Sequence, residues 1–118
     1  MADSILREKS KDFAKSIVLL CREMKQQKTE YALVDQLLRS GTSVGANIYE
    51  AQYAQGTKDF ISKFEIALKE CNESEYWLEL LFEVGSIPKE DFEKFQKQCI
   101  ELRRMLVSSV TKLKQKIS

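Results

Sequence analysis

The chain has 118 residues, the length of one ordinary domain, and its 19 Lys and Arg residues almost balance its 18 Asp and Glu residues. The resulting net charge of +1 argues against a simple polybasic nucleic-acid binder and against an acidic tail protein. One proline and four glycines are too few for a turn-rich β fold. The absence of histidine excludes catalytic triads and metal sites that depend on imidazole.

The apolar segments and the cysteines indicate a cytoplasmic protein. The first residues contain no long apolar run, and the apolar run at residues 17–21 is far shorter than the roughly 20 residues that span a bilayer. Cys21, Cys71 and Cys99 form no Cys-x-x-Cys pair and fall on apolar positions of helical patterns. We therefore expect buried, reduced thiols, no signal peptide and no membrane contact.

Two helices are predicted in the first half of the chain from apolar residues that recur every three or four positions. The first runs from residue 10, or from residue 3, to residue 27, with the stripe Phe13, Ile17, Leu20 and Met24. The second runs from residue 29 or 30 to residue 53, with the stripe Val34, Leu37, Gly41, Val44, Ile48 and Ala51. Gly41 and Gly45 each cost about 1 kcal/mol in a helix interior, but the stripe continues through them. Their spacing predicts close packing of this helix on a neighbour.

Two further helices are predicted in the second half. The third starts at Thr57 as N-cap and ends near Val84 and Gly85, with the stripe Phe60, Phe64, Ala67, Cys71, Ser74, Leu78 and Leu81. The fourth starts near Pro88, with the stripe Phe92, Phe95, Cys99, Leu102, Leu106, Ser109 and Leu113. Four amphipathic helices with short connections predict an all-α fold. We expect a single domain over residues 1–118, an antiparallel up-down-up-down four-helix bundle.

A polar strip is predicted on the second helix. Arg39, Ser43, Asn47 and Glu50 follow one another at steps of four, four and three, beside Gln36 and Ser40. Glu65 and Glu73 of the third helix are expected to face this strip and to pair with Arg39. A buried Arg must be paired, so we interpret the strip as a polar seam that fixes the register of helices or subunits. Contact with a ligand is the alternative.

The adjacent aromatic residues Tyr76 and Trp77 point to different sides of the third helix. One is expected to pack inward and the other to lie at the bundle edge or in a contact between subunits. With Gly41 and Gly45 they are the candidate interface residues.

Charge is distributed unevenly along the chain. The first and fourth helices are net basic, and the second and third are net acidic. No acid follows Glu101, whereas five cations do: Arg103, Arg104, Lys112, Lys114 and Lys116. Two interpretations stay open: a nucleic-acid-facing patch, or ion pairing with the acidic helices.

Nothing in the sequence supplies an enzyme site. The third helix is rich in Glu, but the di-iron site of a four-helix bundle also needs histidines, and the chain has none. The sequence also shows no paired nucleophile and base and no set of metal ligands. We expect no catalytic residues, no metal and no cofactor.

One pair of segments closely resembles a known family. Residues 35–51, DQLLRSGTSVGANIYEA, and residues 58–78, KDFISKFEIALKECNESEYWL, are similar to the bacterial proteins encoded by intervening sequences in 23S rRNA genes. The family includes relatives of the accessory protein of diversity-generating retroelements. The resemblance implies a non-enzymatic bundle that forms a homopentameric ring and associates with RNA or a ribonucleoprotein. The competing hypothesis is a protein–protein scaffold without nucleic-acid contact.

Overall fold

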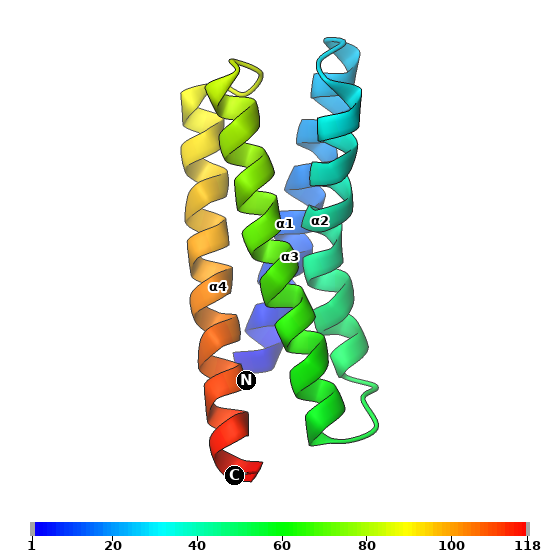
Figure 1. The fold of residues 1–118 in the computed structure, drawn as a ribbon, viewed down its shortest axis with the longest axis vertical. Helices are drawn as coiled ribbons and strands as arrows, with labels where there is room; N and C mark the ends of the chain where they lie inside the picture. Colours follow the sequence, from blue (N-terminus) through cyan, green and yellow to red (C-terminus); the bar gives the residue numbers. More distant parts are fainter. Residues whose placement is uncertain (1, 118) are drawn as a thin grey trace.

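Four antiparallel helices make up the chain in a computed structural model, which describes residues 2–117. They are α1 (Ala2–Gln26), α2 (Tyr31–Ala51), α3 (Thr57–Glu83) and α4 (Lys89–Ile117). Each helix packs against the next, and α4 returns to α1, so the topology is up-down-up-down (Figure 1). The rod measures 48 × 22 × 21 Å. The predicted four-helix bundle is confirmed; Met1 and Ser118, the ends of the predicted domain, lie outside the described residues.

The core is built from the predicted apolar stripes. Every predicted stripe residue of α1 and α2 is buried, including Gly41. In α3 the stripe is buried from Phe64 to Leu81, and Phe60 is half-buried. The last turns of α4 differ, because they bury Val110 whereas Ser109 and Leu113 line an open cavity.

The two glycines of α2 allow α1 to approach closely. A methyl group added at Gly41 would lie 2.9 Å from Cγ2 of Ile17, and one added at Gly45 would lie 3.3 Å from the backbone oxygen of Ser10. Both distances are shorter than an ordinary contact between carbon atoms or between carbon and oxygen. The predicted tight packing is therefore confirmed, and the neighbour is α1 of the same chain.

The ends of α3 show one confirmed and one wrong prediction. At the C-terminus, Gly85 has φ +85°, its N–H donates to the Phe82 carbonyl, and the Ser86 N–H donates to the Leu81 carbonyl. This is the Schellman arrangement, in which glycine avoids the Cβ penalty of a positive φ. At the N-terminus, Gly56 is the cap and Thr57 is already helical, so the prediction of Thr57 as N-cap is wrong.

The three cysteines are free and buried, as expected. Burial raises the pKa of the Cys21 thiol to about 11. The thiol of Cys71, on α3, lies 3.4 Å from the backbone oxygen of Cys99, on α4. These thiols therefore pack as small core groups. In residues 2–117, no helix is long and apolar enough to cross a membrane.

Candidate functional site

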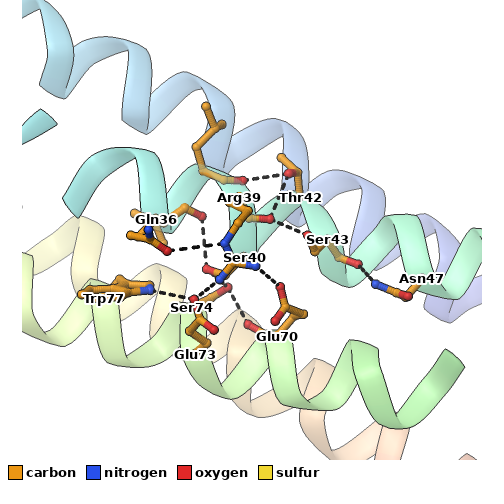
Figure 2. A network of polar contacts seen from close by, with 12 residues as sticks. Gln36, Arg39, Ser40, Thr42, Ser43, Asn47, Glu70, Glu73, Ser74 and Trp77 are labelled. Carbon is orange, nitrogen blue, oxygen red and sulfur yellow. Dashed lines mark hydrogen bonds and ion pairs between the residues drawn. The ribbon is translucent and has the colours of Figure 1, made fainter. Parts of the chain in front are cut away.

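A polar seam joins α2 to α3 midway along the bundle (Figure 2). Arg39 reaches across from α2, and its Nη1 donates a hydrogen bond to Oε2 of Glu70 over 2.7 Å. Its Nη2 donates to Glu73, one turn further along α3. Its Nε lies 3.4 Å from Oε1 of Gln36 on its own helix. One guanidinium therefore holds two carboxylates of the facing helix, which its planar fork of donors suits.

The two members of the main ion pair differ in burial. The side chain of Glu70 is 9% exposed, whereas that of Arg39 is 49% exposed. The chain therefore buries the acid and covers it with the cation. A carboxylate taken out of water in this way must be paired, since an unpaired buried charge is costly.

Glu73 is held from a second side by Trp77. The indole Nε1 donates to Oε2 of Glu73 over 3.1 Å, within one turn of α3. This hydrogen bond, and then the Arg39 guanidinium, lower the pKa of Glu73 below its ordinary value of 4.5. The carboxylate therefore stays charged within the seam.

Hydroxyl and amide groups complete the seam. The hydroxyl oxygens of Ser40 and Ser74 lie 2.9 Å apart in the buried interface, and Ser74 also contacts the Glu70 backbone oxygen at 2.8 Å. Ser43 donates to the Arg39 backbone oxygen over 2.6 Å, and Asn47 donates to that of Ser43 over 2.9 Å. Only the serine pair crosses between helices. Ser43 and Asn47 bond to carbonyls of their own helix.

The structure corrects the predicted partners of Arg39. Glu73 faces it as predicted, but Glu65 does not, because its position on α3 turns it toward α4, where Lys114 lies 2.8 Å away. Glu50 is exposed, and its side chain forms no hydrogen bond or ion pair with another described residue. Glu70 was missed. The sequence feature that could have identified it is its position four residues before the stripe residue Ser74. An acid beside a buried stripe needs a cation from a neighbouring helix.

The five predicted cations of α4 divide into two groups. Arg103 donates to Glu75 over 2.8 Å and to Asn72 over 3.0 Å, both on α3. Lys114 pairs with Glu65. Arg104, Lys112 and Lys116 are exposed and have no ion pair with any other described residue. Ion pairing with an acidic helix therefore accounts for two of the five cations, and three remain available on the surface.

The candidate interface residues also occupy different environments. Tyr76 is 57% exposed, whereas Trp77 is half-buried and hydrogen-bonded to Glu73. Gly41 is covered by Ile17 of α1, so it serves packing within one chain. Tyr76 is thus the member of this group best placed to meet another molecule.

The polar groups of the seam are satisfied by one another, which indicates a structural role. Its two carboxylates are taken up by Arg39 and Trp77, and its hydroxyls by each other and by backbone carbonyls. No cluster of three His, Cys, Asp or Glu residues that could hold a metal ion occurs in residues 2–117. What the arrangement can do is fix the register of α2 against α3, because a one-turn slip would leave Arg39 with only one of the two acids.

Comparisons with known proteins agree with this fold. A family model described as 23S rRNA-intervening sequence protein matches residues 2–108. A crystal structure of a protein with unknown function, from the S23 ribosomal protein family of Bacteroides thetaiotaomicron, is 44% identical in sequence, with a TM-score of 0.91. The match covers 94% of this chain and 99% of that chain. No curated protein matches.

Proposed function

This chain belongs to the 23S rRNA-intervening sequence protein family, and from that membership we propose that it is a non-enzymatic scaffold that assembles with copies of itself and contacts RNA or a ribonucleoprotein. The assembly is a homopentameric ring, as the sequence resemblance implied. The free basic end of α4 is the RNA-facing surface. The cytoplasm is the proposed location, since three free thiols suit a reducing compartment.

Self-assembly is supported by apolar side chains that the single chain leaves uncovered. They lie on all four helices and beyond the end of α2, with exposed fractions between 41% and 72%. The side chains with the highest exposed fractions are those of Leu19, Tyr49, Tyr53 and Tyr76. Aromatic side chains of this kind are enriched at protein–protein contacts.

RNA contact rests on one observation: three cations in the second half of α4 have no acidic partner among the described residues. Arg104, Lys112 and Lys116 follow one another at steps of eight and four, which places them within about a third of a turn around the helix. One chain offers a modest patch. A ring would repeat this patch in every subunit, so an assembly of near-neutral chains would carry a strong local positive potential.

The alternative function is a protein–protein scaffold without nucleic-acid contact. It is favoured by the pairing of Arg103 and Lys114 with acids of α3, which reduces the basic surface from five cations to three. Under this alternative, the remaining cations keep the surface hydrated.

RNA retention on the assembled protein tests the proposal. We expect weak, sequence-independent binding at about 50 mM salt that falls steeply as salt is added, because phosphate contacts release counterions. Replacing Arg104, Lys112 and Lys116 together by Gln should abolish retention and leave the assembly intact. The matched control replaces Lys89, Lys94 and Lys97 at the other end of α4, with the same charge loss, and should retain RNA. If the parent protein retains no RNA at low salt, the protein–protein alternative holds.

A further inference from the structure

Among the residues whose side chains the structure describes, none from α1 lines the corner of the bundle beside the end of α4. The ion pair of Lys9 with Glu101 and the ring contact of Phe13 with Phe95 set the register of α1 against α4. In this register the start of α1 lies near Val107, whereas α4 continues to Ile117, about 15 Å further at 1.5 Å per residue. The last turns of α4 therefore lie beside the start of α3 (Figure 1), and residues at and just beyond the end of α2 line the same pocket.

A cavity of about 570 Å³ occupies this corner. Ala51 and Ala54 at the end of α2, Phe60 of α3 and Leu113 of α4 give it apolar walls. Its volume lies within the roughly 300–1,000 Å³ of small-molecule sites, which combine apolar walls with a few polar groups. The cavity can therefore hold a ligand with a substantial apolar part.

Among the described residues that line the cavity, the charged side chains are positive. Lys112 and Lys116 line it, and none of the described residues that line it is Asp or Glu. Neither lysine forms an ion pair with a residue whose side chain the structure describes. A third cation, Arg7, hydrogen-bonds the side chain of Gln52, which also lines the cavity. An anionic group at the rim would meet two ammonium groups without displacing an acid.

We propose that this end cavity binds a small amphipathic anion, an unbranched alkyl chain that ends in a carboxylate. The chain lies against Ala51, Ala54, Phe60 and Leu113, and the carboxylate pairs with Lys112 and Lys116. A free phosphate group would not use the apolar walls, and a metal cation would meet two lysines and no acid among the described lining residues. The combination of apolar walls and a lysine rim favours an anion that carries an alkyl chain.

Titration of the full chain with sodium decanoate, well below the concentration at which it forms micelles, tests this site. Methyl and amide NMR shifts should saturate at Ala51, Ala54 and Leu113. Octanoate should bind more weakly, by up to about fourfold per methylene removed, as expected when each methylene is buried. Decyltrimethylammonium, with the same chain and the opposite charge, and inorganic phosphate, without a chain, should cause no saturable shift.

Paired variants separate this site from general surface binding. The double variant Lys112→Gln and Lys116→Gln should weaken decanoate binding at least fivefold. The control Lys94→Gln and Lys97→Gln, on the same helix and with the same charge loss, should bind like the parent. The proposal is overturned if decanoate causes no saturable shift at 1 mM, if the cationic amphiphile binds equally well, or if the shifts map to another part of the bundle.

Discussion

Arg39 of α2 and Glu70 of α3 form an ion pair over 2.7 Å in which the acid is buried and the cation is half exposed. The asymmetry decides what each residue contributes. Removing the cation leaves a buried carboxylate without its cation, whereas removing the acid leaves a guanidinium that water can reach. Arg39 therefore acts mainly by making the burial of Glu70 tolerable.

The first prediction is that Arg39→Ala destabilises the fold. The stranded Glu70 carboxylate should lower the free energy of unfolding by about 1–3 kcal/mol, the cost of an unsatisfied buried group. Adding Glu70→Gln to this variant should recover part of the loss, because the stranded charge is then gone. Chemical denaturation measures both changes.

Lys25→Ala is the matched control for this prediction. Lys25 also pairs with an acid of a neighbouring element, Asp35, but both side chains are exposed. We expect its denaturation midpoint to stay close to that of the parent. If Arg39→Ala unfolds and assembles like the parent but loses a binding partner, Arg39 is a ligand-binding residue and the seam is not structural.

The second prediction concerns acid pH. The pKa of Glu73 is lowered in the folded state, first by the Trp77 hydrogen bond and then by Arg39. Its stabilisation is therefore complete above the unfolded pKa, ordinarily 4.5, and disappears as the pH falls through the lower folded value. The loss of unfolding free energy between pH 6 and pH 3.5 should be smaller in Glu73→Gln than in the parent.

Glu8→Gln is the control for the pH experiment. Glu8 is exposed, and its side chain has no hydrogen bond or ion pair with another described residue. This variant should lose as much stability as the parent over the same interval. Equal losses in Glu73→Gln and in the parent would contradict the assignment of Glu73 as a charged member of the seam.

The third prediction is that Gly41→Ala lowers stability, although alanine is the better helix former by about 1 kcal/mol. The new methyl group would lie 2.9 Å from Cγ2 of Ile17, and overpacking of this kind costs about 1–3 kcal/mol. An increase in the thermal midpoint of Gly41→Ala would show that α1 and α2 are not tightly packed at this glycine.

The fold could be predicted from the sequence because its physical signal is local. Each helix carries a stripe with a 3.6-residue period, and in α2 the stripe runs through Gly41 without changing phase. Burial of that stripe outweighs the low helix propensity of the two glycines. The small side chains then become a packing feature against Ile17 of α1 rather than a break.

The pairing across helices could be predicted only in part. Periodicity places Glu65, Glu70 and Glu73 on α3, but which acid meets Arg39 depends on the rotation of α3 about its axis. That rotation turns Glu65 toward Lys114 and buries Glu70. The end cavity was not predicted, because it depends on the register of α1 against α4, which no local pattern encodes.

Self-assembly is the part of the account that both the RNA-contacting and the protein-only functions require. Light scattering coupled to size-exclusion chromatography at micromolar concentration measures it directly. The account predicts an assembly with five times the chain mass of 13.7 kDa. A single species of 13.7 kDa under these conditions would contradict it.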